Sequence, residues 1–187
     1  MFFALWPDPA LQSALVDAAR NVVAAAGGRP VLPESLHVTL AFLGAVPDAD
    51  LGKVEAIGAE VARTAERAPV QLAFNAIEYW KKPQVICATA PAPTAGTSLA
   101  DALATTLKAR LVAAGFTPDL KPFRAHVTLV RKVPRGTYDR ALQPVIWGFT
   151  DFALVGSRPG PDGSSYSILN SWPLCTEVRK MPEKKHK

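Results

Sequence analysis

The sequence predicts an α+β fold built from antiparallel strands and amphipathic helices. Segments with apolar residues at helical spacing are interleaved with short segments rich in β-branched and aromatic residues. Several strand-like segments are neighbours along the chain and are separated only by short turns, which is typical of antiparallel pairing. The tetrad His-Val-Thr-Leu occurs at 37–40 and again at 126–129, once in each half of the chain. This repeat fits two lobes that are related by an approximate two-fold axis, with a cleft between them.

The first quarter of the chain predicts a strand, a helix and a second strand. Residues 2–6 are apolar and form the first predicted strand. Asp8 is a good N-cap with Pro9 at the first helical position, and the helix that follows stops at the glycine pair 27–28. The first tetrad lies in a strand predicted over residues 35–43.

The second quarter predicts a helix followed by two strands. Asp48 is expected to cap the helix, which ends before Pro69. Residues 70–79 and 84–90 are predicted strands joined by a tight turn. Trp80 lies at this turn, and we interpret it as a half-buried anchor; the alternative is a wall of a substrate cleft.

The second half predicts a loop, a helix and three strands. The loop at 91–97 is the expected junction of the two lobes, although strands can cross between the lobes. Leucines at every fourth position then form the apolar stripe of a third helix. The second tetrad lies in a strand predicted over 123–131. The stripe is Leu99, Leu103, Leu107 and Leu111, a loop with a short helix is expected at 134–143, and the closing strands at 145–156 and 165–174 flank a turn at 159–163.

The charge distribution separates a body from a tail. We expect one domain over residues 1–177 and a disordered basic tail over 178–187. The formal net charge is +5, and the tail carries five of the basic residues against one acidic residue. A better indication of an anionic ligand is the stretch 119–135, where five basic residues face only Asp119.

The cysteines and the hydropathy of the chain indicate the cellular compartment that we expect. Cys87 and Cys175 are expected as free thiols of a cytoplasmic protein, because the apolar start does not read as a signal peptide. A disulfide between them is the alternative. No apolar run is long enough to span a bilayer.

The repeated tetrad carries the strongest chemical signal. Side chains alternate across a strand, so His37 and Thr39 share one face while the apolar residues of the tetrad point toward the core. His126 and Thr128 repeat this arrangement. If the two strands lie side by side, two imidazoles and two hydroxyls converge on one pocket, and imidazoles with pKa ~6.5 suit paired acid and base catalysis. A single histidine on a strand is more often structural, but repetition of the whole tetrad favours a catalytic pair.

The two tetrads resemble the His-x-Thr/Ser-x motifs of the two-histidine (2H) phosphoesterases. Within them, the sequence is most similar to the RNA 2′,3′-cyclic phosphodiesterases, which are also called 2′-5′ RNA ligases. The resemblance covers about residues 2–175; Ala125 stands where this family often has proline, and no arginine precedes Phe2. The matching stretches are 2–5, 36–44 and 122–131, with weaker matches at 79–80, 83–86, 166–169 and 172–174.

The resemblance implies two lobes with antiparallel sheets lining a central cleft and helices on the outer faces. It implies that His37 donates a proton to the 3′ oxygen of a cyclic phosphate and that His126 is the base on water, giving a 2′-phosphomonoester. The symmetry of the motifs leaves these two roles interchangeable. Thr39 and Thr128 are expected to hold phosphate oxygens and to stabilise the charge that develops on them.

Two further candidates each lie five residues past a motif histidine. Arg131 is expected to bind the phosphate through two hydrogen bonds, with an exposed strand-end arginine as the alternative. Strict alternation places Arg131 opposite His126, so the strand must end or bulge between them. Phe42 is expected to stack on the terminal base, or else to be part of the core.

The sequence also bears on cofactors and on other classes of function. No cofactor or metal is expected, because a metal hydrolase needs three or more good ligands and only two histidines lie outside the tail. No phosphate-binding glycine loop and no dinucleotide motif is present. The expected partners are RNA or oligonucleotide ends and cyclic nucleotides, without a membrane, and the expected state is a monomer. A non-catalytic binder of RNA ends and a reversible 2′-5′ RNA ligase remain as alternatives.

Overall fold

The structure of the chain is a computed structural model that describes residues 1–91, 98–134, 138, 140–160 and 163–174. The predicted loops at 91–97 and 134–143 lie partly outside these residues, and so does the turn at 159–163; the basic tail lies wholly outside them. The elements are β1 (Phe2–Leu5), α1 (Pro9–Ala25), β2 (Arg29–Pro30), β3 (Val38–Phe42), α2 (Leu51–Thr64), β4 (Val70–Trp80), β5 (Val85–Thr89), α3 (Leu99–Ala113), β6 (His126–Arg131), β7 (Arg140–Phe149), β8 (Asp151–Gly160) and β9 (Gly163–Pro173), with 3₁₀ turns at Pro33–Ser35 and Asp48–Asp50.

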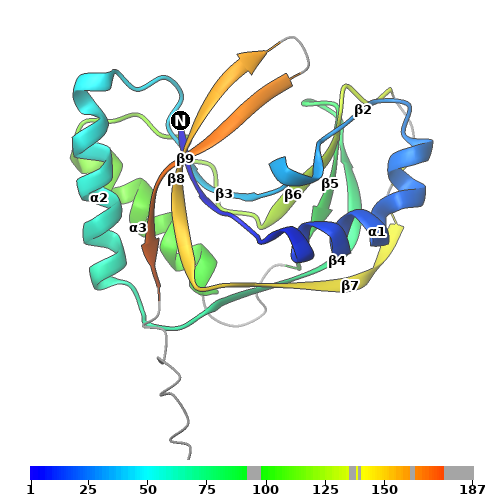
Figure 1. Cartoon of the computed structure of the whole chain (residues 1–187), viewed down its shortest axis with the longest axis horizontal. Helices are drawn as coiled ribbons and strands as arrows, with labels where there is room; N and C mark the ends of the chain where they lie inside the picture. Colours follow the sequence, from blue (N-terminus) through cyan, green and yellow to red (C-terminus); the bar gives the residue numbers. More distant parts are fainter. Residues whose placement is uncertain (92–97, 135–137, 139, 161–162, 175–187) are drawn as a thin grey trace, which may run out of the picture.

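The strands form two antiparallel sheets (Figure 1). One has the order β3-β1-β8-β9 and the other the order β2-β6-β5-β4-β7. This confirms the predicted α+β class with antiparallel pairing. The sheets are not formed by successive halves of the chain, because β4 and β5 pair with later strands while β8 and β9 return to pair beside β1.

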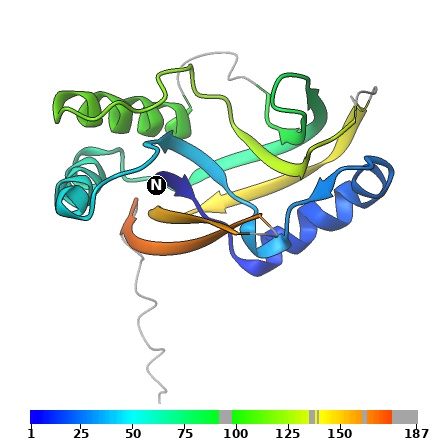
Figure 2. The same cartoon turned by 90° about the horizontal axis from the view of Figure 1, so that it is seen from above.

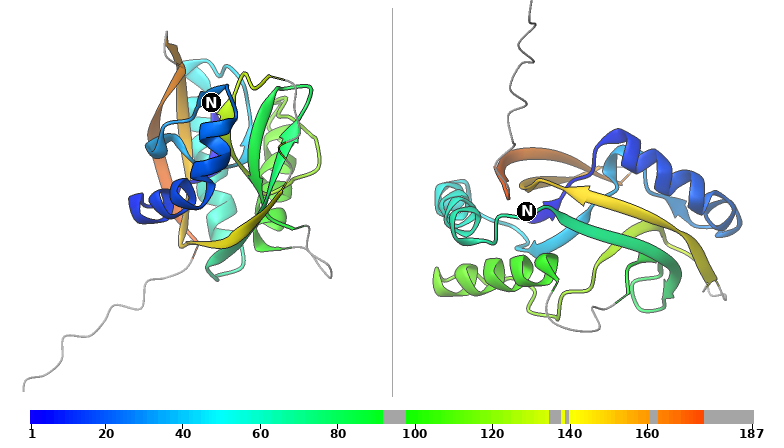
Figure 3. Two further views of the ribbon diagram at one scale, coloured as in Figure 1. Left: turned by 90° about the vertical axis from the view of Figure 1, so that its right-hand side faces the viewer. Right: turned by 90° about the horizontal axis from the view of Figure 1, so that it is seen from below.

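The helices lie on the outside of the sheets. α2 and α3 pack against each other at one end of the molecule, where they contact β9 and β3, and α1 packs against β7 at the other end (Figures 2 and 3). The predicted leucine stripe of α3 belongs to the core, in which Leu103, Leu107 and Leu111 are buried. Trp147 of β7 is fully buried, and its indole N–H donates to the carbonyl of Leu11 in α1 at 2.9 Å.

The predicted start of α1 is confirmed, and that of α2 is wrong. The backbone N–H of Leu11 donates to the carboxylate of Asp8 at 2.9 Å, with Pro9 in the first turn. Asp48 instead opens a 3₁₀ turn, and α2 begins at Leu51 without a side-chain hydrogen bond at its N-cap. The 3₁₀ turn already supplies the change of direction into the helix, so the carboxylate of Asp48 lies too early to cap α2.

The end of the chain differs most from the prediction. The strand expected over 145–156 is two strands, β7 and β8, which are separated at Thr150 and belong to different sheets. In place of the expected loop with a short helix, β7 already begins at Arg140. The partners of these strands, β4 and β1, are distant in sequence, so the local pattern does not reveal where the chain changes sheet.

A glycine allows the short strand β2 to lie close to β6. A Cβ at Gly28 would stand 2.6 Å from the carbonyl oxygen of Arg131 and 2.9 Å from the side chain of Val130. Only glycine permits this approach without displacing backbone. It fixes the register in which Arg29 pairs with Arg131. Among the described residues, no helix has the length and apolar character needed to cross a lipid bilayer.

Candidate active site

The two tetrads meet in one small cavity, although they belong to different sheets. The strand β3 is an edge strand of one sheet, and β6 lies between β2 and β5 in the other. Their polar side chains face a shared cavity of about 50 Å³, while the apolar residues of both tetrads are buried. A cavity of this size accommodates a few water-sized groups, which suits a phosphate. Its lining is Val31, Ser35, His37, Thr39, His126, Thr128 and Arg131.

An irregularity at the same position of both motifs extends this lining. In β3, Thr39 and Ala41 face consecutive residues of β1, so Leu40 is an extra residue. In β6, Thr128 and Val130 face consecutive residues of β5, so Leu129 is an extra residue. Such a bulge reverses the alternation of side chains beyond it. The polar face of each strand therefore continues to the residue five positions after its histidine.

That continuation explains where Arg131 and Phe42 lie. Arg131 lines the same cavity as His126, as the predicted bulge requires. Phe42 is 51% exposed, so it is not a core residue. It lines two larger grooves, one of which contains His126 and the other His37. The structure thus brings together all six residues singled out from the sequence.

Both imidazole rings are oriented by the backbone in the same way. The Nδ1 atom of His37 lies 2.7 Å from the carbonyl oxygen of Ser35, and Nδ1 of His126 lies 2.7 Å from the carbonyl oxygen of Arg124. A carbonyl only accepts, so Nδ1 carries the hydrogen in each ring. The Nε2 atom of each ring is left to accept a proton when neutral or to donate one when charged.

His37 is enclosed by aromatic rings. Phe2 and Trp6 stack on it at centroid distances of 4.9 and 5.0 Å, and the edge of Tyr166 lies at 5.2 Å. Burial lowers the pKa of His37 to about 4; the hydrogen bond to the carbonyl of Ser35 opposes this shift, and the charges of Arg131 and His126 add to it. In the unliganded protein His37 is therefore neutral near pH 7.

His126 lies against an ionic network instead. Trp80 packs on it at 4.5 Å, and the guanidinium of Arg124 lies over the Trp80 ring at 5.4 Å. The carboxylate of Glu78 accepts from the indole of Trp80 at 3.1 Å, from the hydroxyl of Thr89 at 2.9 Å and from Arg124. Burial lowers the pKa of His126, with Arg124 and Arg131 adding to the shift, while the Arg124 carbonyl and the charge of Glu78 oppose it.

The sequence reasoning missed Glu78 and preferred a purely anchoring role for Trp80. The structure shows that Trp80 is half-buried and also forms a wall beside His126. Glu78 and Trp80 are two residues apart and share a face, because β4 continues through Trp80 and does not end at residue 79 as predicted. Their spacing was the only signal that the local sequence offered. Nothing in that spacing indicates that the face is turned toward His126. Trp6 and Tyr166, which enclose His37, gave no comparable local signal.

Two grooves lead away from the small cavity, one beside each histidine. The His126 groove has a volume of about 870 Å³ and is lined by His126, Trp80, Phe123, Arg124, Lys82 and Lys121, among others. The His37 groove has a volume of about 530 Å³ and is lined by His37, Phe2, Tyr166, Arg29, Arg131 and Lys132, among others. Thr39 and Phe42 line both grooves, so the small cavity lies where the two meet.

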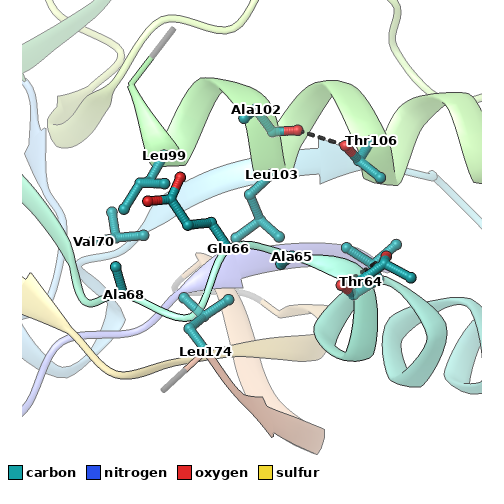
Figure 4. A pocket seen from close by; sticks show the side chains of 11 residues that line it. Thr64, Ala65, Glu66, Ala68, Val70, Leu99, Ala102, Leu103, Thr106 and Leu174 are labelled. Carbon is teal, nitrogen blue, oxygen red and sulfur yellow. Dashed lines mark hydrogen bonds between the residues drawn. The ribbon is translucent and has the colours of Figure 1, made fainter.

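Other features of the described residues are separate from this site. A cavity of about 210 Å³ between the end of α2 and the start of α3 contains none of the motif residues (Figure 4). No group of three or more His, Cys, Asp and Glu that could hold a metal ion occurs in the described part of the chain. Cys87 is a free thiol 3.9 Å from the hydroxyl of Thr128, and burial raises its pKa to about 12, so it is a poor nucleophile. Cys175 lies outside the described residues.

Comparisons with known proteins identify the family of the chain. Residues 5–87 match the family model "LigT like Phosphoesterase". An RNA 2′,3′-cyclic phosphodiesterase of Thermus thermophilus is 32% identical over 183 residues, which are 95% of this chain and 91% of that protein. One from Bacillus subtilis is 32% identical over 61% of this chain and 64% of its own length.

Solved structures show the same fold. The structure of TT0787 of Thermus thermophilus has a TM-score of 0.75 at 31% identity and covers 94% of this chain and 98% of its own. The structure of Escherichia coli LigT complexed with 3′-AMP has a TM-score of 0.79 at 22% identity, with 94% of this chain and 97% of that chain covered.

Proposed function

The chain belongs to the LigT-like phosphoesterase family, and from this premise we propose that it opens RNA 2′,3′-cyclic phosphate ends to 2′-phosphomonoesters by paired-histidine catalysis without a metal. Two relatives that carry the name RNA 2′,3′-cyclic phosphodiesterase support the substrate class. The observation that carries the mechanism is the shared cavity, in which both histidines, both threonines and Arg131 meet.

The proposed reaction uses the two Nε2 atoms on opposite sides of phosphorus. His126 accepts a proton from water through Nε2 while the water oxygen attacks phosphorus. The bond between phosphorus and the 3′ oxygen breaks, and His37 delivers a proton from Nε2 to that oxygen. The product carries a phosphate on the 2′ oxygen and a free 3′ hydroxyl, and exchange with solvent restores the two protonation states.

The surroundings of the rings favour this assignment of roles. A bound phosphodiester carries a negative charge, which raises the pKa of His37 and lets the complex take up the proton that the free protein lacks. Once charged, a ring enclosed by Phe2 and Trp6 is a strong acid, so proton transfer to a leaving oxygen is favourable. The charge of Glu78 favours the cationic form that His126 reaches after it accepts a proton.

The remaining side chains of the site are suited to bind the phosphate group and the terminal base. The hydroxyls of Thr39 and Thr128 come from strands of different sheets that line the same cavity, and they would donate to the non-bridging oxygens. The guanidinium of Arg131 would bind the same oxygens and stabilise the charge of the transition state. The exposed ring of Phe42 at the junction of the grooves would stack on the terminal base.

One assay tests the proposal directly. An RNA that ends in a 2′,3′-cyclic phosphate is incubated with the protein in excess chelator, and the isomer of the product is identified. We expect a 2′-phosphate, and we expect His37→Ala and His126→Ala each to lower turnover by at least about 100-fold with the fold intact. Wild-type turnover by either variant would refute the paired-histidine mechanism.

The same assay separates the two alternatives. A binder without catalysis would retain cyclic nucleotides and give no turnover in the wild-type protein. A ligase would join the cyclic phosphate to a 5′-hydroxyl RNA through a 2′-5′ bond when that RNA is supplied in excess. Hydrolysis is favoured here because water is the more abundant nucleophile.

A further inference from the structure

Arg29 is a cationic side chain that the proposed reaction does not use. It lies in β2 and pairs with Arg131 of β6, so the two arginines stand side by side on neighbouring strands. The close approach at Gly28 fixes this register. Within the described residues, the Nη2 atom of Arg29 is buried and has no hydrogen-bond partner. A buried cationic donor without an acceptor is unfavourable, and Arg29 lines the His37 groove, so its guanidinium is suited to an anion that arrives with a ligand.

Among the described residues, the groove that contains Arg29 has positive charge without a carboxylate to balance it. Arg29, Arg131 and Lys132 line the His37 groove, and none of its described lining residues is an aspartate or a glutamate. None of these three residues forms an ion pair with another described residue. In the His126 groove, Lys121 pairs with Asp119 at 3.1 Å and Arg124 pairs with Glu78, whereas Lys82 and Lys108 form no ion pair with another described residue. The feature that distinguishes the His37 groove is the buried Nη2 atom of Arg29, which has no hydrogen-bond partner among the described residues.

The direction of the substrate follows from the position of the proton donor. His37 protonates the 3′ oxygen, so the ribose that carries this oxygen must lie on the side of His37. The His37 groove opens from that side and shares His37, Thr39 and Arg131 with the small cavity. The RNA chain leaves the ribose through its 5′ oxygen, and the next group along the chain is a phosphodiester with one negative charge.

We propose that Arg29, assisted by Lys132, binds the phosphate on the 5′ side of the terminal nucleotide. The site thereby distinguishes the end of an RNA chain from a cyclic mononucleotide, which has no such phosphate. The proposal rests on the proposed function and on His37 as the proton donor. The chemistry of the ligand is that of an internucleotide phosphodiester, for which a guanidinium supplies two parallel donors.

Two substrates that differ only in this phosphate test the proposal. One is adenosine 2′,3′-cyclic phosphate, and the other is the diadenosine phosphodiester that ends in the same cyclic phosphate. We expect Arg29→Met to lower kcat/KM about tenfold or more for the dinucleotide and less than about twofold for the mononucleotide. The matched control is Lys82→Met in the His126 groove, which should leave the ratio of the two kcat/KM values unchanged.

A modified substrate keeps the test valid if Arg29→Met folds poorly. A methylphosphonate in place of the internucleotide phosphate removes its charge and preserves the length of the chain. The wild-type protein should lose its preference for the dinucleotide with this substrate, and Arg29→Met should lose nothing further. Equal losses on both substrates, or a lost preference in Lys82→Met alone, would overturn the proposal. Absence of wild-type turnover on every substrate would instead refute the proposed function.

Discussion

The enclosure of His37 predicts a specific loss of stability at mildly acidic pH. The pKa of His37 is about 4 in the folded protein, because burial disfavours the charged ring, and ~6.5 in an unfolded chain. Between these values the unfolded chain binds a proton that the folded protein excludes. The free energy of unfolding therefore falls as the pH falls through this window, and it is constant with respect to this group above about pH 7.

The size of the effect follows from the difference between the two pKa values. Linkage gives a loss of about 2 kcal/mol between pH 7.5 and pH 5, and about 3 kcal/mol once the pH is below 4. The measurement is urea unfolding at pH 7.5 and pH 5 in a buffer without phosphate, for the wild-type protein and for His37→Gln. The difference between the two proteins isolates His37, because titrating carboxylates contribute to both.

Substitution of the other motif histidine provides the control. His126→Gln retains His37 and should therefore retain most of the pH dependence, although burial also lowers the pKa of His126. Added inorganic phosphate should reduce the loss in the wild-type protein, because an anion in the cavity raises the pKa of His37. If His37→Gln and the wild-type protein lose the same free energy between pH 7.5 and pH 5, the ring is not held neutral by its enclosure.

Two further predictions concern residues outside the motifs. Glu78→Gln should lower kcat several-fold and shift the acidic limb of the kcat–pH profile to lower pH, because the charge that favours protonated His126, the proposed base, is removed. An unchanged profile would show that the carboxylate only holds Trp80 in place. Gly58→Ala should destabilise the fold by about 1–3 kcal/mol in urea unfolding, because its Cβ would lie 2.6–2.8 Å from ring atoms of Trp172. Gly52→Ala in the same helix meets no atom within 4 Å and should instead stabilise by up to about 1 kcal/mol, so equal effects of the two substitutions would refute the packing argument.

The local sequence pattern was sufficient to predict which residues form the polar faces of the two motif strands. Alternation along a strand placed His37 with Thr39 and His126 with Thr128 before any tertiary contact was known. Arg131 required one more step, since its place in the cavity depends on the bulge at Leu129. That bulge is a property of the pairing between β5 and β6, which are distant in sequence. The sequence shows that β6 must contain a bulge if Arg131 is to face the same side as His126. It does not show that the bulge is present.

Long-range pairing also accounts for what the sequence missed. Arg29 was not singled out from the sequence, and its place beside Arg131 depends on the pairing of β2 with β6. Tyr166 reaches His37 because β9 joins the sheet of β1 through β8, at the opposite end of the chain. The change of sheet at Thr150, which creates this arrangement, lies within a continuous strand-like run. Residues like these are not marked by spacing or composition.

The two motifs are alike in sequence and in strand geometry, so they cannot by themselves decide which histidine is the acid. The same backbone contact orients both rings, and the same bulge follows both threonines. The asymmetry comes from residues that the repeat does not contain. An aromatic enclosure makes charged His37 a strong acid, whereas the carboxylate of Glu78 favours the protonated form of His126. In the proposed mechanism, a symmetric pair of motifs thus acquires distinct acid and base roles from neighbours supplied by non-equivalent parts of the fold.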